Sequence, residues 1–364
     1  MEGTDLREMA KRRRVRGVLA LCGTVLVASV LAACSFSDDD SSADDIPRVG
    51  LMHVGTDHIP PSMGSLATQL EKEFGWNLPD PEIDRCVEKK RESCDFEGED
   101  IVLLWRNLEP DEADAQAEVF VGQGIDVIVA YEDRSIDAAQ KATVESETPI
   151  VFLHPSDPVR DGLVESLDRP GSNLTGVYGP RDVVGKQLEL YELLVPRLRR
   201  VLTLVDPEDP GSERLLAQYQ AAAVELPRPL QLVIREASSA EDLKRIFGSL
   251  QPGEIDGAFL LSASLRLNHS ALTIRLAQRA RIPVQAHRKE WVEQGALYSY
   301  GIDLDPIGRA GARYVDSLLR DTPPAELPVE EVSTTEFAIN LETAARLGIK
   351  VPQDMIIRAD EVYR

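Results

Sequence analysis

The sequence is poor in basic residues, in cysteine and in aromatic side chains. Of its 364 residues, 40 are Lys or Arg and 62 are Asp or Glu, which gives a formal net charge of −22. A chain of this charge lacks the basic face that a nucleic-acid binder needs, so we expect no nucleic acid among its partners. Four cysteines are too few for a fold held together mainly by disulfides.

The motifs of common catalytic sites are also missing. The sequence contains no G-x-S-x-G elbow, Walker loop, G-x-G-x-x-G or H-E-x-x-H. The five histidines are dispersed, although His53 and His154 end predicted strands and could face a cleft. We therefore expect no enzyme activity, no cofactor and no metal. An enzyme of another type and a His/Asp/Glu metal site are the alternatives.

A basic and then apolar segment opens the chain. Residues 11–16 read KRRRVR, and the uncharged run of residues 17–33 follows, which is the pattern of a secretory signal peptide. The run ends in Leu31-Ala32-Ala33-Cys34, which resembles the bacterial lipobox. We predict that residues 1–33 are removed and that Cys34 is lipidated. An uncleaved membrane anchor is the alternative, and both place the rest of the chain outside the cytoplasm.

The sequence also predicts an acidic tether and a disulfide. Residues 34–46 are rich in Ser and Asp and form an acidic tether without apolar periodicity. Cys86 and Cys94 lie close together in a chain that we expect to be exported, and we predict a disulfide between them. Reduced or metal-bound thiols are the alternative, but no C-x-x-C or neighbouring histidine supports a metal.

From Ile46 onward, short apolar runs alternate with helical patterns. The predicted strands are 48–54, 100–106, 126–131, 149–154, 173–178, 201–206, 230–236, 257–261, 284–286 and 297–302. The predicted helices are 63–74, 113–122, 136–143, 184–194, 212–225, 240–250, 271–280, 290–294, 306–320 and 340–347. Residues 75–98 are an irregular insert, and 329–339 are an extended polar segment. Because the apolar strand runs are continuous, the pattern predicts an α/β fold of two doubly wound, Rossmann-like lobes.

The last 70 residues cannot form a third core of their own, so they must complete both lobes. The chain therefore crosses between the lobes more than once, which creates a hinge. In such folds the carboxyl ends of both sheets surround a shared cleft, where a ligand binds.

A set of short blocks resembles the substrate-binding proteins of ABC importers, in the group related to tryptophan and tyrosine binders. The segment 149–177 carries the densest part, as PIVFLHPSDPVRDGLVESLDRPGSNLTGV. Its matching blocks are Asp157-Pro158-Val159, Gly162-Leu163-Val164, Arg169-Pro170-Gly171, Asn173 and Thr175-Gly176. Further matches are GKQLEL at 185–190, GALYSYG at 295–301, LPVE at 327–330, INL at 339–341, AARLG at 344–348 and RADEV at 358–362.

The resemblance implies a type I periplasmic-binding-protein fold with three crossovers. It places the N-lobe at 47–179, completed by 299–327, and the C-lobe at 180–298, completed by 328–364. It also implies a monomeric, lipid-anchored receptor that captures a small molecule, most simply an amino acid, and delivers it to the permease subunits of an ABC transporter. A sensor of the same fold coupled to a membrane signalling protein is the alternative, ahead of an enzyme or an adhesin.

One turn departs from the pattern of this family. Where relatives often have a G-T-P-A-A-like turn, this chain has Tyr131-Glu132-Asp133-Arg134-Ser135, with Glu132 in place of Gly and Asp133 in place of Thr. Either Arg134 binds the carboxylate of a ligand, or the acidic pair selects a cationic or polyhydroxy ligand. The third possibility is that these side chains face solvent.

The remaining candidates for the cleft are the residues that follow predicted strands or lie near the hinge. Asp157 and Asp206 could instead serve as turn or capping residues, and each tyrosine could instead pack in the hinge. The expected ligand-binding set is Gly55, Thr56, Tyr131, Asp133, Arg134, Ser156, Asp157, Tyr178, Asp206, Ser262, Ser264, His287, Arg288, Tyr298 and Tyr300.

Overall fold

The computed structural model describes residues 46–55, 60–78, 93–179, 183–209 and 211–364. The chain divides into two compact units, residues 1–43 and residues 44–364. All helices and strands described below belong to the second unit, so the predictions for the signal segment, for Cys34 and for most of the tether lie outside the described residues.

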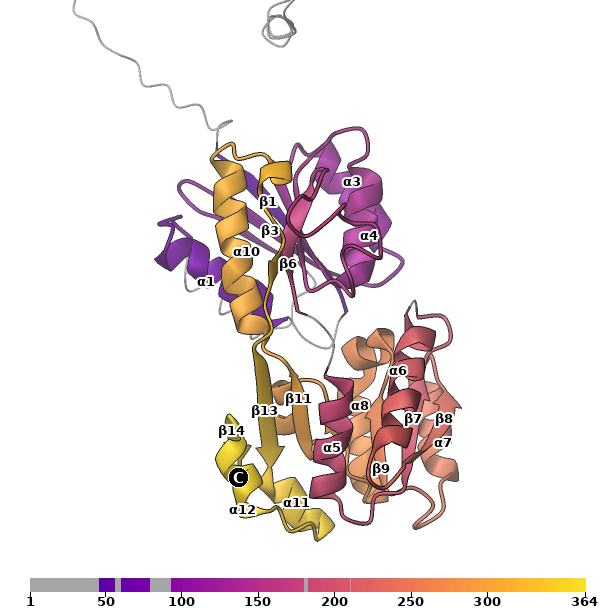
Figure 1. The fold of residues 1–364 in the computed structure, drawn as a ribbon. Helices are drawn as coiled ribbons and strands as arrows, with labels where there is room; N and C mark the ends of the chain where they lie inside the picture. Colours follow the sequence, from indigo (N-terminus) through magenta and orange to yellow (C-terminus); the bar gives the residue numbers. More distant parts are fainter. Residues whose placement is uncertain (1–45, 56–59, 79–92, 180–182, 210) are drawn as a thin grey trace, which may run out of the picture. The chain divides into compact units, whose positions relative to one another are not determined.

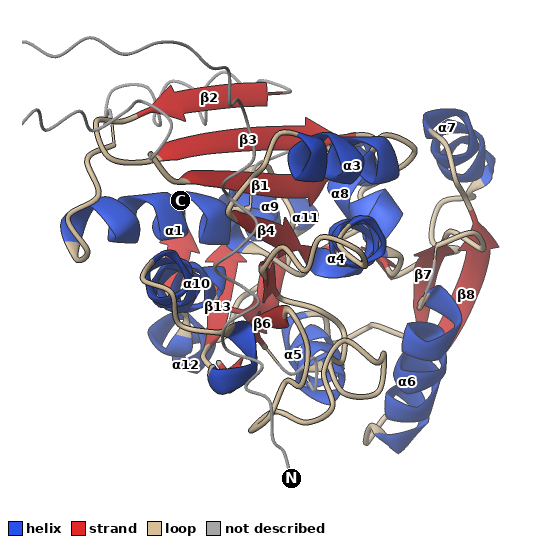
Figure 2. Cartoon of the chain, turned by 90° about the horizontal axis from the view of Figure 1, so that it is seen from above, coloured by secondary structure: helices blue, strands red, loops and turns tan. Residues whose placement is uncertain are grey.

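The first sheet has seven strands in the order β12-β6-β5-β4-β1-β3-β2. Its parallel centre consists of β1 (Arg48–Val54), β3 (Val102–Leu108), β4 (Val127–Tyr131), β5 (Ile150–Leu153) and β6 (Leu174–Tyr178). One edge is β2 (Ser93–Glu97), antiparallel to β3, and the other is β12 (Glu330–Glu331). Figure 2 shows β2, β3, β1 and β4 in this order, with β6 farther along the sheet. All five residues of β4 are buried, as expected for a central strand covered on both faces.

Helices cover both faces of this sheet, and each face has its own apolar cluster. On one side, α1 (Pro61–Lys72) and α10 (Leu304–Leu319) pack with residues such as Met63, Leu66 and Ile307 (Figure 1). On the other side, α3 (Ala113–Gly122) and α4 (Glu132–Ala142) pack through Phe120 and Ile136. A short 3₁₀ helix, η1 (Pro324–Glu326), follows α10.

The second lobe contains two sheets that continue into each other. One has the order β8-β7-β9, from β7 (Arg200–Val205), β8 (Gln231–Glu236) and β9 (Gly257–Leu260). The other has the order β10-β11-β13-β14, from β10 (Gln285–Ala286), β11 (Tyr298–Ile302), β13 (Thr335–Asn340) and β14 (Glu361–Tyr363). A parallel bridge between Ala258 and Val284 links β9 to the start of β10.

Two apolar clusters again lie on opposite faces. The first receives α5 (Val184–Leu194), α6 (Ser212–Glu225), α11 (Leu341–Leu347) and α12 (Gln353–Arg358). The second receives α7 (Ala240–Ser249), α8 (Ala263–Ala280) and α9 (Lys289–Glu293). The predicted α/β architecture of two doubly wound lobes is therefore confirmed.

The chain passes between the lobes three times, and strand pairing defines where. The first passage follows β6, and the second is at Asp303, between β11 and α10. The third lies between β12, which pairs with β6, and β13, which pairs with β11. Residues 299–302 thus belong to the second sheet and 330–331 to the first. The expected boundaries at 298 and 327 are corrected by a few residues, because strand pairing decides which lobe a segment completes.

Several elements differ from their predicted ranges. Helix α4 begins at Glu132 and α8 at Ala263, four and eight residues before the predicted starts. The insert 75–98 was expected to be irregular, but it contains the edge strand β2. The polar segment 329–339 contains β12 and most of β13, and the sequence patterns did not indicate α12 or β14.

The segment that carries the family resemblance has a structural role around β6. Gly176 has φ +152°, and a Cβ there would lie 2.1 Å from the carbonyl oxygen of Phe152 on β5, so no other residue fits. The Asn173 amide donates to the Thr148 carbonyl at 2.7 Å, and the Thr175 hydroxyl donates to the Leu327 carbonyl at 2.7 Å. This motif holds β6 against β5 and against the segment after α10.

Candidate functional site

Aromatic side chains line the carboxyl edge of the first sheet. His53 at the end of β1 pairs in register with Tyr131 on β4 and with Asn107 on β3. The Tyr131 ring lies between two histidines, with ring centroids 5.4 Å from His53 and 6.2 Å from His154. His53 Nδ1 and Asn107 Oδ1 are 2.7 Å apart and both residues are buried. These side chains form an aromatic and hydrogen-bonded row at the strand ends.

Three charged residues follow β4, and two of them, Asp133 and Arg134, are bound by other residues of the protein. Arg134 forms a bidentate pair with Asp114 on α3, at 2.8 Å and 3.0 Å, and this hydrogen bonding lowers the pKa of the Asp114 carboxyl. Asp133 accepts hydrogen bonds from the backbone N–H of Ser156, at 2.7 Å, and from its hydroxyl. Only Glu132 lines the cavity described below.

The second lobe supplies a buried arginine. Arg288 follows β10, and its side chain is only 10% exposed. Its Nε lies 3.3 Å from a Glu290 carboxylate oxygen, and its guanidinium lies over the Trp291 ring at 5.9 Å. Burial alone would lower the pKa of Arg288, but nearby Glu290, Tyr131 and Glu132 raise it overall. Nη2 of Arg288 is buried and has no hydrogen-bond partner among the described residues.

A hydrogen-bonded network around Gln187 supports the same edge. The buried Gln187 amide donates to the Tyr300 carbonyl at 2.6 Å and lies 3.4 Å from His287 Nδ1. Its oxygen accepts from the buried Tyr219 hydroxyl. His287 Nε2 lies 3.3 Å from the Leu260 carbonyl, so the network favours a neutral ring with its proton on Nε2.

These groups surround a hollow of about 590 Å³ between the two lobes. The first lobe contributes aromatic and acidic groups, and the second contributes cationic and amide groups. The lining residues are Tyr131, Glu132, His154, Val183, Val184, Gln187, Leu215, Tyr219, Arg266, His287, Arg288, Gly301, Ile302 and Leu304.

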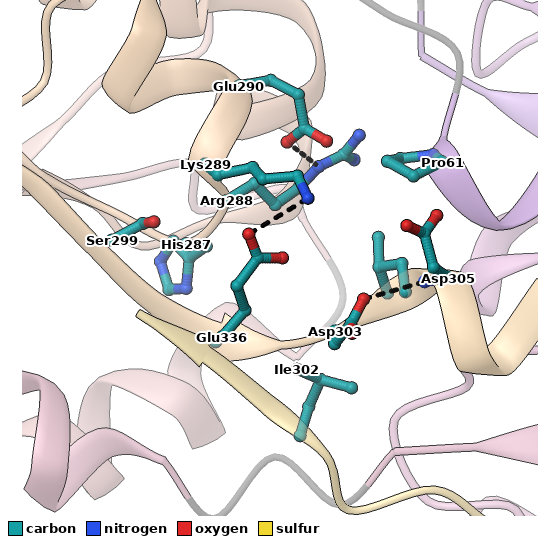
Figure 3. Close-up of a pocket in the computed structure, with 12 residues that line it drawn as sticks. Pro61, His287, Arg288, Lys289, Glu290, Ser299, Ile302, Asp303, Asp305 and Glu336 are labelled. Carbon is teal, nitrogen blue, oxygen red and sulfur yellow. Dashed lines mark hydrogen bonds and ion pairs between the residues drawn. The ribbon is translucent and has the colours of Figure 1, made fainter. Parts of the chain in front are cut away.

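A smaller hollow of about 320 Å³ adjoins it and shares His287 and Arg288 (Figure 3). Here Lys289 Nζ lies 3.1 Å from Glu336 on β13 and 3.9 Å from Glu361. Burial raises the pKa of the Glu336 carboxyl, while the hydrogen bond from Lys289 opposes that shift. Asp303 caps α10 by accepting from the N–H of Asp305 at 3.1 Å. Lys289 and Asp303 are therefore engaged within the protein at the hinge.

Three of the expected ligand-binding residues come together in the larger hollow: Tyr131, His287 and Arg288. Arg134 does not line it, because Asp114 holds its guanidinium. Gly55 does not line it either, and a Cβ on Gly55 would lie 2.9 Å from Leu267 of α8. Thr56 and Cys86 lie outside the described residues.

The other expected residues make local contacts. Asp133 and Ser156 bond to each other, and Asp157 accepts from the N–H of Arg160 in a turn. The Ser262 hydroxyl accepts from the N–H of Asp206 at 2.7 Å, and the Ser264 hydroxyl donates to the Asp206 carboxylate at 2.8 Å. The Tyr178 hydroxyl donates to Glu331, the Tyr300 hydroxyl bonds Thr335, and Tyr298 is fully buried. These residues act in turns, in the core or at the hinge.

The expected ligand-binding set lacked five polar residues of the hollow: Glu132, His154, Gln187, Tyr219 and Arg266. Of these, the sequence analysis raised only Glu132, as part of an acidic pair, and His154, as a residue that could face a cleft. Glu132 and Arg266 lie in the first turns of α4 and α8, which begin earlier than predicted. Glu132 directly follows β4, whereas Arg266 lies six residues after the end of β9. Gln187 and Tyr219 gave no such signal, because they lie within helices.

No helix among the described residues is both long and apolar enough to cross a membrane. In the same part of the chain, no group of three or more His, Cys, Asp or Glu side chains could hold a metal ion.

Comparison with known proteins places this geometry in a family. Residues 92–363 match the profile described as "ABC transporter substrate binding protein". The chain is 27% identical over 270 residues to the "Tyrosine-binding protein" of Clostridioides difficile (strain R20291), which covers 73% of this chain and 76% of that protein.

Solved structures agree on the fold. A conserved domain protein from Vibrio cholerae superposes with a TM-score of 0.70 at 24% identity, covering 87% of this chain and 99% of that one. The ABC domain from Streptococcus pneumoniae in complex with L-Trp gives 0.66 at 20% identity, covering 86% and 99%. The chain therefore belongs to the ABC transporter substrate-binding protein family and has the two-lobed fold of type I periplasmic binding proteins.

Proposed function

We propose that this protein binds an amino acid in the larger hollow and delivers it to the permease of an ABC importer. The observation that carries the proposal is Arg288, a nine-tenths buried cation whose Nη2 has no hydrogen-bond partner among the described residues. A buried guanidinium group is suited to bind a carboxylate with two parallel hydrogen bonds. The carboxylate of the ligand would thus bind to the second lobe.

The walls of the hollow fit the rest of such a ligand. Tyr131, His154 and Tyr219 contribute aromatic side chains to the lining, and Leu215 and Ile302 contribute apolar side chains. The names of two similar proteins, a tyrosine-binding protein and a complex with L-Trp, support an amino-acid ligand. Binding needs no chemical step, only contacts from both lobes that stabilise a closed form.

The proposal includes the location of the protein. Removal of residues 1–33 and lipidation of Cys34 would anchor a monomeric receptor on the extracytoplasmic side of a bacterial membrane, close to its permease. In that oxidising environment, Cys86 and Cys94 would form a disulfide. Mass spectrometry of protein from membranes tests both, because an unmodified full-length N-terminus and free thiols would contradict them.

Thermal melting with a panel of ligands tests the binding function. The panel contains the common L-amino acids, with nucleosides, sugars, polyamines and divalent metals for comparison. An amino acid at 100 times its dissociation constant adds about 2.7 kcal/mol to the free energy of unfolding, which gives a clear shift in Tm. Shifts with sugars or metals alone would overturn the assignment, and so would a Tm that no amino acid changes.

A further inference from the structure

Glu132 has a backbone conformation that normally belongs to glycine. It directly follows β4, and its φ is +60°. The left-handed conformation costs a side-chain-bearing residue roughly 1 kcal/mol relative to glycine. Such strain is typical of residues retained for a function rather than for folding.

Of the three charged residues 132–134, only Glu132 has a side chain that no other described residue holds. Asp133 is held by Ser156, and Arg134 by Asp114. Glu132 is half-buried, lines the larger hollow and forms no ion pair with any described residue. A carboxylate placed in a hollow without a partner is expected to find one in the ligand.

A cationic side chain, Arg288, lines the hollow from the other lobe. It lies close enough to Glu132 for that carboxylate to raise the pKa of its guanidinium, yet the two side chains form no ion pair. A negative group on one lobe and a positive group on the other suit a ligand that carries both charges. Such a ligand satisfies both groups only when the lobes close around it.

We propose that the Glu132 carboxylate binds the ammonium group of the ligand while Arg288 binds its carboxylate, so that the site selects zwitterions. This inference rests on the proposed amino-acid function and adds to it a requirement for the amine. An α-amino acid would bind, whereas the same molecule without its amine would bind poorly. The amine would lie beside the aromatic side chains of Tyr131 and His154.

Titration calorimetry with matched ligands tests this requirement. The probes are L-tyrosine and L-tryptophan, each with its des-amino analogue, 3-(4-hydroxyphenyl)propanoate or 3-(indol-3-yl)propanoate. Wild-type protein should bind each analogue about 10- to 100-fold more weakly than the amino acid, as expected for loss of a hydrogen bond to a charged group. In Glu132→Gln the amino acids should weaken by a similar factor, and the analogues should not weaken at all.

A second substitution separates binding from folding. Glu132→Gly suits the left-handed backbone, so we expect a Tm close to that of the wild type together with the same loss of amino-acid affinity. Glu147→Gly is the matched control, because Glu147 also has a positive φ of +55° but is exposed beyond α4. It should change the Tm in a similar way and leave affinity unchanged.

The outcomes distinguish this inference from the function on which it rests. If removing the amine weakens binding as much in Glu132→Gln as in wild type, the role of Glu132 is wrong and the amino-acid function stands. If Glu132 instead pairs with Arg266 or faces solvent, both variants will bind the amino acids normally, which also overturns it. If wild-type protein binds no common L-amino acid, both proposals fail.

Discussion

The two walls of the larger hollow are built by different means. On the first lobe, Tyr131 and His154 come from the ends of two neighbouring parallel strands, so the sheet itself sets their spacing. On the second lobe, Gln187 and Tyr219 come from two helices, and hydrogen bonds hold them in place. The first wall is aromatic with one carboxylate, and the second is cationic and rich in hydrogen bonds.

This difference assigns distinct tasks to the two lobes. A wall fixed by strand register offers shape, which discriminates ligands by the fit of their apolar parts. A wall built from a buried arginine and an amide network offers directed hydrogen bonds, which fix the orientation of a ligand. Breaking each wall separately should therefore produce different defects.

The largest effect is expected from the cationic wall. Arg288→Gln removes the charge that we assign to the ligand carboxylate, so the Kd for the best-binding amino acid should rise about 100-fold, as for the loss of a bidentate charged contact. Titration calorimetry measures the change.

Arg134→Gln is the control for this substitution, because Arg134 pairs with Asp114 instead of lining the hollow. Its half-exposed ion pair contributes less than about 1 kcal/mol to stability, and affinity should not change. Equal losses of affinity in the two variants would show that Arg288 is not the specific anchor.

A smaller effect, on stability, is expected from the amide network. Gln187→Leu leaves the buried Tyr219 hydroxyl and the Tyr300 carbonyl without their partner. Unsatisfied buried groups are costly, and we expect a loss of about 2 kcal/mol in the free energy of unfolding, measured by urea titration. Gln220→Leu, at an exposed position of α6, should lose almost nothing. Equal unfolding midpoints for the two variants would contradict the structural role of the network.

The smallest effect concerns a helix start away from the hollow. Hydrogen bonds from Arg245, Ser239 and the N–H of Ser238 lower the pKa of Asp242 to about 2. A lowered carboxyl pKa stabilises the folded state above its unfolded value near 3.8, and this contribution disappears as the pH falls toward 2.

Asp242→Asn should therefore be less stable than wild type at pH 7, and the difference should shrink between about pH 4 and pH 2. Thermal melting over this range measures it. Ligand affinity at pH 7 should stay unchanged, which separates the stability of the second lobe from its binding wall. A pH-independent difference would argue against the carboxylate as its cause.

The architecture could be predicted from the sequence because buried parallel strands have continuous apolar runs. Runs such as VIVA in β4 and IVFL in β5 predicted the strand positions. Tyr131 was found because it ends a strand, and His287 and Arg288 were found because they follow one. The position of a residue at a strand end can be inferred without knowing any partner.

The rest of the site depends on partners that a linear pattern does not show. Arg134 was a candidate until Asp114, 20 residues away on α3, proved to hold it. Helix α8 was expected to start at 271, because its first turns lack a clear apolar period and the Ser262 side chain bonds Ser212 and the Asp206 N–H instead of capping the helix. Arg266 was therefore not assigned to a helix that faces the hollow.

The left-handed backbone at Glu132 also has a consequence for how this receptor can evolve. Glutamate and glycine codons differ by a single base, and the protein already adopts the conformation that glycine prefers at this position. Exchanging the two residues therefore leaves the fold intact in either direction. The requirement for an amine on the ligand could therefore be gained or lost in one mutational step, without an unstable intermediate between the two specificities.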